Sequence, residues 1–212
     1  MEETPKLSIV VAVKDGAENV SALLDAVMDQ PDRPELILCS SGLPPHIAEE
    51  AGVVTISLPE DTLIPKLWSE GIVRARGHAV TLTTGEFRPG ANWVAEMLKA
   101  DTRQWVGVGG AIDNDPHASL RNWAIFFLRY SAFALPLAAG ETREIAADNA
   151  IYDRAAILEH PDLLDDGFWE PSFHRRFLAA GRRLALDPKL LIVHHGTVSA
   201  RSFTHQRYLH GR

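Results

Sequence analysis

The sequence is poor in cysteine and in basic residues, and each shortage excludes a class of protein. Cys39 is the single cysteine, so the chain has neither an internal disulfide nor a metal site made of several cysteines. Lysine and arginine number 21 against 28 acidic residues, which gives a formal net charge of -7. Binding to nucleic acid requires a dense basic surface, so this charge balance argues against that function.

Glycine-rich phosphate-binding loops are also missing. The first strand-like run is not followed by G-x-G-x-x-G, and the chain contains no lysine-serine P-loop. The run Gly107-Val108-Gly109-Gly110 lies late in the chain, and no obvious helix follows it. These absences argue against a nicotinamide-dependent enzyme and against a nucleoside triphosphatase.

No hydrophobic run is long enough to span a membrane, because a spanning helix needs about 20 apolar residues. The most apolar segment runs from Trp123 to Ala139 and is interrupted by Arg129 and Pro136. We expect it to form a helix that is buried or lines a groove; the alternative is a helix that makes peripheral contact with a membrane. Residues 1–6 lack the apolar core of a signal peptide, so we expect a cytoplasmic protein, or one at the inner face of the membrane.

What is present is the alternation of strand-like and helix-like segments that is typical of an α/β domain. This alternation predicts a mainly parallel central sheet, wound in right-handed crossovers and flanked by helices. With 212 residues and an apolar fraction of 46%, we expect a single domain over residues 1–212 with one sheet. The strand patterns cover residues 7–13, 35–39, 53–56, 79–82, 105–109, 183–186 and 190–193, the last two separated by Asp187-Pro188.

Small and polar residues follow three of these predicted strands. They are Lys14-Asp15, Ser40-Ser41 and Thr84-Gly85-Glu86, the last within the stretch TLTTGEFRP. Ligands of parallel α/β sheets bind beyond the carboxyl ends of the strands. The sequence therefore predicts a binding site at this edge, although the third strand end offers only one carboxylate.

Six segments, taken in their order and spacing, resemble the family 2 glycosyltransferases, which have the glycosyltransferase-A fold. Each segment alone is only loosely diagnostic, but together they cover nearly the whole chain. They are LSIVVAVKDGAENV (7–20), ELILCSSG (35–42), GIVRARGHAVTLTTGEFRPGANWV (71–94), ADNAIYDRAAI (147–157), FWEPSFHRRFLAAGRRL (168–184) and LIVHHG (191–196).

The resemblance implies a single Rossmann-like glycosyltransferase-A domain. Residues 1–112 would form the half that binds the nucleotide sugar, and residues 113–212 the half that binds the acceptor. The implied enzyme moves a sugar from a nucleotide-diphosphate sugar to an acceptor hydroxyl, with inversion at the sugar carbon. Negative charge builds up on the departing diphosphate, and the family commonly recruits a divalent cation, Mn²⁺ or Mg²⁺, to stabilise it.

The implied cation site has fewer acidic ligands here than in the family. In the family, an acidic motif after the fourth strand binds the cation. This chain has Thr84-Gly85-Glu86 at that position, so Glu86 is the remaining acidic ligand. The resemblance supplies a second ligand from His194 or His195 at the end of the last strand, and we expect a weakly held ion. The alternatives are a solvated acid that starts a helix and a histidine hydrogen-bonded within the core.

Glu170 falls where the family places its catalytic base. An inverting transfer needs a carboxylate near the acceptor hydroxyl to take its proton. In the family this is the acid of a Glu-Asp pair ahead of a helix that ends in glycine, and counting back from Gly181 places that pair on Trp169-Glu170. The indole of Trp169 could stack on a sugar ring and raise the proton affinity of Glu170 by excluding water. The alternative is a surface acid that leads into a helix.

The remaining implied contacts line the nucleotide-sugar cleft. Lys66, like Arg74 and Arg76, is a candidate for meeting the phosphate charge, or else belongs to a solvated helix face. The full set of cleft residues is Val13, Asp15, Glu18, Ser40, Ser41, Lys66, Glu86, Asp148, Asn149 and Trp169.

Two other functions compete with the transferase. One is a non-catalytic relative that binds a sugar nucleotide or a partner, which the missing acids at Thr84 and Ser40 favour. The other is a component of a membrane-associated assembly, docked through the apolar segment that begins at Trp123.

Overall fold

The computed structural model describes residues 4–14, 17–28, 30, 33–42 and 53–196. The strands are β1 (Leu7–Val13), β2 (Glu35–Ser41), β3 (Val53–Leu58), β4 (Ala79–Thr84), β5 (Phe87–Pro89), β6 (Gly107–Asn114), β7 (Gly140–Thr142), β8 (Ala150–Asp153) and β9 (Leu184–His194). The helices are α1 (Ala17–Met28), α2 (Ile64–Arg74), α3 (Trp93–Lys99), α4 (Leu120–Tyr130), α5 (Arg154–Leu158), α6 (Pro161–Asp166) and α7 (Glu170–Ala179), with 3-10 turns η2 (Ser131–Phe133) and η3 (Ala147–Asn149).

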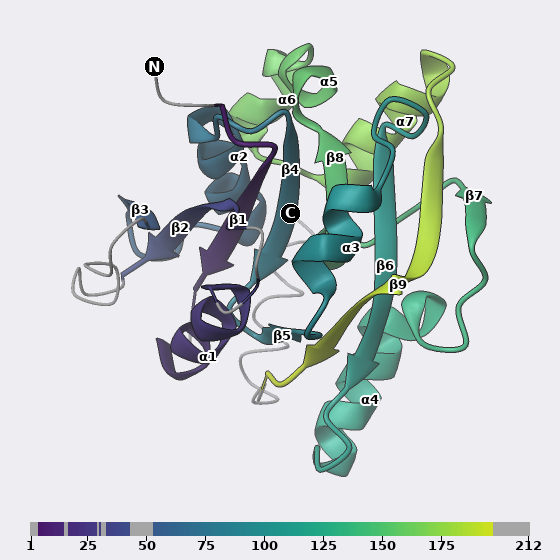
Figure 1. Ribbon diagram of the computed structural model, residues 1–212. Coiled ribbons are helices and arrows are strands. Elements are labelled where there is room, and N and C mark those ends of the chain that lie inside the picture. Colours follow the sequence, from purple (N-terminus) through teal and green to yellow (C-terminus); the bar gives the residue numbers. More distant parts are fainter. Residues whose placement is uncertain (1–3, 15–16, 29, 31–32, 43–52, 197–212) are drawn as a thin grey trace.

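One nine-stranded sheet runs through both halves of the chain, in the order β3-β2-β1-β4-β8-β6-β9-β5, with β7 paired to β9. The strands from β3 to β4 are parallel, as predicted. The second half is mixed: β8 is antiparallel to both β4 and β6, whereas β6 and β9 are parallel. Strands β1, β4 and β6 therefore all point toward the edge where β5 and α4 lie (Figure 1).

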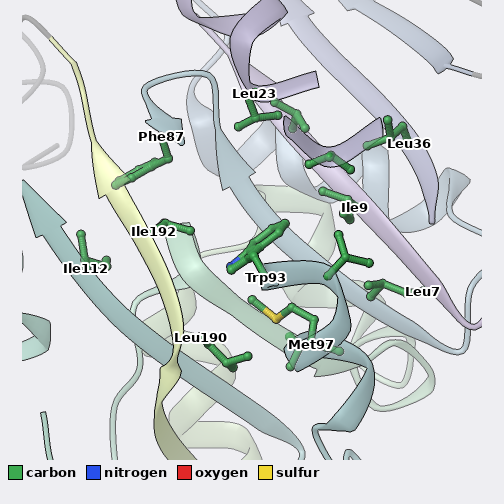
Figure 2. Packing of buried hydrophobic residues seen from close by; sticks show 14 of the residues in the cluster. Leu7, Ile9, Leu23, Leu36, Phe87, Trp93, Met97, Ile112, Leu190 and Ile192 are labelled. Carbon is green, nitrogen blue, oxygen red and sulfur yellow. The ribbon is translucent and has the colours of Figure 1, made fainter. Parts of the chain in front are cut away.

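Helices cover both faces of the sheet because its central strands are apolar on both sides. Along β1, Ile9 and Val11 face one hydrophobic cluster, and Val10 and Ala12 face the other. Figure 2 shows the first cluster, where Trp93 and Met97 of α3 lie over strand residues such as Ile192. The second cluster lies under α2, α5, α6 and α7.

Strand β9 (Leu184–His194) is continuous, which corrects the prediction of two strands over residues 183–186 and 190–193. Strand β9 pairs with β6 throughout, but the register shifts because Gly110 lies opposite Asp187 and Ala111 opposite Leu191. The bulge places the Leu190 carbonyl oxygen 1.9 Å from where a Cβ on Gly110 would stand, so only glycine fits there. Pro188 is tolerated because it lies within this bulge.

The apolar segment from Trp123 to Ala139 is not one helix. Helix α4 ends at Tyr130, and η2 covers the next turn. Within α4, Phe126 and Tyr130 are buried, whereas Phe127 and Leu128 are exposed. In the part of the chain that the structure describes, we find no helix with the length and apolarity needed to cross a bilayer.

Candidate active site

Ionisable side chains from five separate elements converge at the carboxyl edge of the sheet. Glu86 lies in the turn between β4 and β5, and β5 pairs with the end of β9, where Phe87 is opposite His194. The N–H of His195 donates to the Glu86 carbonyl oxygen at 2.8 Å, which fixes the turn against β9. Helix α4, η3 and the first turn of α7 contribute the remaining groups, described below.

Glu86 lies between an imidazole and a guanidinium. Its Oε2 is 3.6 Å from His194 Nε2 and 3.8 Å from Arg129 Nη1, distances that are too long for hydrogen bonds but short enough for electrostatic attraction. Burial raises the pKa of Glu86, but the polar contact with His194 and the charge of Arg129 outweigh burial and leave the pKa below its ordinary value. Glu86 is therefore ionised at neutral pH.

Asp148, in η3, is the most buried acid of the group, with 8% of its surface exposed. Its burial raises the pKa of the carboxyl, and the charge of Glu86 adds to the increase, while Arg129 opposes it. The cluster therefore contains a carboxyl that holds its proton more tightly than an ordinary aspartate does.

Glu170 is the first residue of α7 and is partly exposed. Its burial raises the pKa of the carboxyl to about 7, and the negative charge of Asp148 adds to the increase. The backbone amides of Glu170 and Ala147 and the charge of Arg129 act in the opposite direction. A carboxylate with a pKa near neutrality is suited to accept a proton at physiological pH.

Arg129 connects these acids. Burial disfavours its charge, but Tyr130, Asp148, Glu86 and Glu170 outweigh burial, so the pKa of the guanidinium lies above its ordinary value. Glu86 and Glu170 thus lie within the electrostatic range of one guanidinium, although 84 positions separate them (170 − 86). The charge of Arg129 therefore acts on both of the carboxylates that the sequence singles out.

Several buried polar atoms around this cluster have no hydrogen-bond partner among the described residues. They are Thr84 Oγ1, Asn114 Nδ2, Tyr130 Oη and His194 Nε2. Buried polar groups in folded proteins are nearly always hydrogen-bonded, to protein or to bound water and ligands. Polar atoms of this kind beside a partly exposed acid are typical of a ligand site.

A hollow of ≈ 500 Å³ adjoins the cluster and shares His194 with it. It is lined by residues at the end of β6 and in the first turn of α4, including Ser119 and Arg121. At its wall, His195 Nδ1 lies 3.0 Å from Asp115 Oδ2. The ring of His195 therefore pairs with Asp115, whereas the ring of His194 lies beside Glu86.

Of the residues predicted to contact the nucleotide, some lie at the carboxyl edge of the sheet and others lie outside the described residues. Val13 and Ser40 are opposite each other at the ends of β1 and β2, but the Val13 side chain is buried in the core, so only its backbone can reach a ligand. Ser40 and Ser41 are buried at the same edge, 1% and 8% exposed. Asp15 lies outside the described residues, and so does the side chain of Glu18.

The basic candidates Lys66, Arg74 and Arg76 do not lie at one edge of the sheet. Lys66 is in the first turn of α2, which follows the carboxyl end of β3. Lys66 Nζ forms an ion pair with Glu70 Oε1 at 2.8 Å and donates to the Asp165 carbonyl oxygen at 3.3 Å. Arg76 pairs with Glu35, the first residue of β2, at 2.7 Å, which places it at the opposite, amino edge of the sheet. Exposed Arg74, the last residue of α2, precedes the start of β4 at that amino edge too. The suggestion that Arg74 and Arg76 meet a diphosphate was wrong.

Asn149 is a structural residue, which corrects its assignment to the donor site. It is 0% exposed, and its Oδ1 accepts a hydrogen bond from Trp93 Nε1 at 2.9 Å. Its Nδ2 donates to the carbonyl oxygens of Ala111 at 2.9 Å and Leu190 at 2.7 Å. Both amide hydrogens are used to hold the bulge between β6 and β9, and none is left for a ligand.

Trp169 immediately precedes the proposed base and is partly exposed. Its Nε1 donates to the Asp166 carbonyl oxygen at 3.1 Å. This bond fixes the indole over the end of α6.

A divalent cation does not fit this cluster well. Among the described side chains, no three or more His, Cys, Asp or Glu residues are grouped so that they could hold a metal ion. Glu86 and His194 are neighbours, but the Arg129 guanidinium already stands 3.8 Å from the same Glu86 oxygen. A cation bound to that oxygen would meet a fixed positive charge.

Sequence reasoning missed the role of Arg129, as well as Tyr130 and Asn114. Arg129 was noticed only as an interruption of an apolar segment. A charge inside such a segment is itself a signal, because a buried charge requires partners of opposite sign. The sequence could not say which acids those partners were.

No protein-family model and no curated protein sequence matches this chain. Among solved structures, it is similar to the mannosyltransferase PcManGT from Pyrobaculum calidifontis in complex with GDP-Man and Mn²⁺, with a TM-score of 0.65 and 15% identity. It is also similar to S. aureus TarS 1-349 in complex with UDP-GlcNAc, with a TM-score of 0.69 and 13% identity.

These matches cover 97% and 94% of this chain but only 61% of either neighbour, so the chain spans about three fifths of their length. At such low identity the likeness concerns the fold alone. The chain has an α/β fold of the glycosyltransferase kind, with a large mixed sheet flanked by helices.

Proposed function

We propose that this protein is an inverting glycosyltransferase of the family 2 kind, which moves a sugar from a nucleotide-diphosphate sugar to an acceptor hydroxyl. The observation that carries the proposal is the cluster itself. Glu86 lies 3.8 Å from the Arg129 guanidinium, whose charge also acts on Asp148 and Glu170, and the pKa of Glu170 is about 7. The fold shared with a mannosyltransferase that binds GDP-Man supports a nucleotide-sugar donor.

In this proposal Glu170 is the catalytic base. The acceptor oxygen attacks the anomeric carbon of the donor sugar as its proton passes to a carboxylate oxygen of Glu170. The bond from the anomeric carbon to the diphosphate oxygen breaks on the opposite face, and its electron pair leaves with the nucleoside diphosphate. One displacement of this kind inverts the anomeric centre.

The other residues bind and orient the substrates. We assign the nucleotide to the ends of β1 and β2, at the backbone of Val13 and at Ser41, and we expect the partly exposed indole of Trp169 to stack on a sugar ring. The hollow of ≈ 500 Å³ beside His194 and His195 is where we place the acceptor. It shares His194 with the cluster and contains no residue of β1 or β2, where we place the nucleotide.

Nucleotide-sugar transfer is tested in two steps. A thermal-shift screen of UDP, GDP, UDP-GlcNAc and GDP-Man is expected to raise the melting temperature for at least one nucleotide, because binding to the folded state stabilises it. The stabilising sugar nucleotide is then incubated with acceptor sugars, and release of nucleoside diphosphate is followed by chromatography. Glu170→Gln is expected to bind the donor as the parent does but to lose at least about 100-fold in transfer.

A protein that binds the donor without transferring its sugar is the second candidate. The replacement of the first motif acid by Thr84, whose Oγ1 is buried without a partner, favours it. Saturable nucleotide binding, with no turnover in either the parent or Glu170→Gln, would support this candidate and contradict the transferase.

A further inference from the structure

Arg129 supplies a fixed positive charge to the acidic cluster, and it comes from an element outside the nucleotide-sugar-binding half. It is the penultimate residue of α4, and its Nη1 stands 3.8 Å from Glu86 Oε2. Its charge also acts on Asp148 and Glu170, as their electrostatics show. Each of the three acids at the site therefore has the same cationic neighbour.

The guanidinium is held in place but not enclosed. Its Cζ lies 4.8 Å from the centroid of the Tyr130 ring, which is a cation–π contact. Its position in the last turn of α4 places it at the negative end of the helix dipole. A quarter of its side-chain surface, 25%, remains exposed, so the guanidinium is accessible to a ligand.

We propose that the guanidinium of Arg129, in place of a divalent cation, stabilises the diphosphate of the donor, so that nucleoside diphosphates bind to this protein without a metal ion. The inference rests on the proposed function, because it takes the donor to be a nucleotide-diphosphate sugar. It departs from the metal site that the sequence resemblance implied.

Phosphate recognition by arginine supports this inference. A guanidinium offers several N–H donors in a planar fork that matches two phosphate oxygens, and its charge does not depend on pH. Arginine and divalent cations perform the same electrostatic role on a departing phosphoryl group. Here Glu86 orients the arginine, whereas in a metal site the same acid would be a ligand.

Electrostatic repulsion between Arg129 and a metal ion also supports this inference. Two positive charges a few ångströms apart in a partly buried site repel each other by several kcal/mol at the effective dielectric of a protein surface. A metal ion on Glu86 Oε2 would have to displace Arg129, which interacts with three acids and the Tyr130 ring. Arg129 is therefore the cation of the site.

Isothermal titration of UDP and of GDP, in buffer with EDTA and in buffer with MnCl₂, tests the inference. We expect the nucleotide that binds to do so in EDTA with an affinity within about threefold of that in Mn²⁺. In EDTA, Arg129→Met is expected to weaken binding at least about tenfold, because the charged fork is lost while the length of the side chain is kept. The affinity of Arg129→Lys for the nucleotide is expected to lie between that of the parent and that of Arg129→Met.

Arg175→Met is the matched control, since Arg175 is an exposed arginine on α7 and is expected to leave the affinity unchanged. Circular dichroism checks that each variant is folded; should Arg129→Met be unfolded, Arg129→Lys and the comparison of EDTA with Mn²⁺ decide the question.

The outcomes separate this inference from the function on which it rests. Binding seen only with Mn²⁺, or binding unaffected in Arg129→Met, overturns the role of Arg129 and leaves the transferase proposal standing. No binding of any nucleoside diphosphate in either buffer overturns both.

Discussion

At the scale of single residues, the surroundings of Glu170 change the proton affinity of its carboxyl. The groups that face it are Asp148 from η3 and Arg129 from α4, together with the backbone amides of Ala147 and of Glu170 itself. Burial and the charge of Asp148 outweigh the other influences and raise its pKa to about 7. Its protonation therefore changes across the physiological range.

The first prediction concerns the pH dependence of transfer. A base must be ionised, so kcat/KM is expected to rise about tenfold per pH unit below the pKa of Glu170, about 7, and to level off above it. The measurement is the pH profile of sugar transfer between pH 5 and 9. A rate that is flat between pH 5 and 8 would contradict Glu170 as the base.

The second prediction concerns the loss of folding stability when Glu170 ionises. The folded-state pKa lies above the ordinary value of 4.5, so the folded protein keeps a proton that the unfolded chain loses between pH 4.5 and about 7. The contribution of Glu170 to stability is complete below pH 4.5 and is lost as the pH rises to about 7.

Glu170→Gln, which cannot ionise, is therefore expected to unfold with a free energy higher by about 3 kcal/mol at pH 8. At pH 4.5 it is expected to match the parent. Urea denaturation at both pH values provides the comparison, and an equal difference at the two would show that ionisation is not the cause.

Asn149 gives the third prediction, on stability instead of binding. Asn149→Ala leaves the buried Trp93 Nε1 and the carbonyl oxygens of Ala111 and Leu190 without their partner. We expect a loss of about 3 kcal/mol in the free energy of unfolding. The control is Asn92→Ala, since Asn92 is exposed and its side chain does not cap α3, and this change is expected to cost less than about 0.5 kcal/mol.

At the scale of elements, α4 presents one buried and one exposed aromatic side by side. Phe126 is 1% exposed and packs among the core residues, whereas Phe127 is 53% exposed. Both belong to the apolar segment from Trp123 to Ala139, for which the sequence leaves contact with a membrane open. Of the two phenylalanines, Phe127 is the one placed to make such a contact, and its neighbour Leu128 is exposed as well.

The fourth prediction follows from that asymmetry. Phe126→Glu buries a charge and is expected to cost more than about 4 kcal/mol, whereas Phe127→Glu is expected to change stability by less than about 1 kcal/mol. Thermal denaturation of both variants measures the difference. Phe127→Glu is then the variant to use in co-sedimentation with anionic vesicles, because it removes apolar surface without unfolding the protein.

At the scale of the whole molecule, the sheet joins the two halves of the chain. Strand β8, from the second half, pairs with β4 and with β6, so it lies between two strands of the first half. The N–H of Arg154 also donates to the His78 carbonyl oxygen at 3.1 Å. Neither half has a complete sheet without the other.

The fifth prediction is that the chain unfolds in one cooperative step. We expect far-UV circular dichroism and tryptophan fluorescence to give coincident urea transitions, because the tryptophans lie in both halves and the backbone pairing links them. Two separated transitions would instead indicate two independent domains.

The sequence by itself determined strands β1 to β4 but missed the short strand β5, whereas the ligand-binding edge and the candidates Glu86, Glu170 and His194 stay predictions. These follow from local signals: apolar runs of strand length, polar residues at strand ends, and the spacing of a glycosyltransferase-like order. It also predicted a break at Asp187-Pro188, where the structure has a bulge. A proline marks a local irregularity, but only pairing with β6 decides whether the strand continues.

The tertiary structure alone decided which charges meet. From the sequence, Arg129 was an interruption of an apolar segment, and Asn149 was a predicted contact of the donor sugar. A sequence gives the type of a side chain but not its neighbours. Folding brought Arg129 to Glu86 and Glu170, and it enclosed Asn149 between Trp93 and the bulge of β9. Electrostatic energy and hydrogen bonding depend on distances through space, and those distances are fixed only in the folded structure.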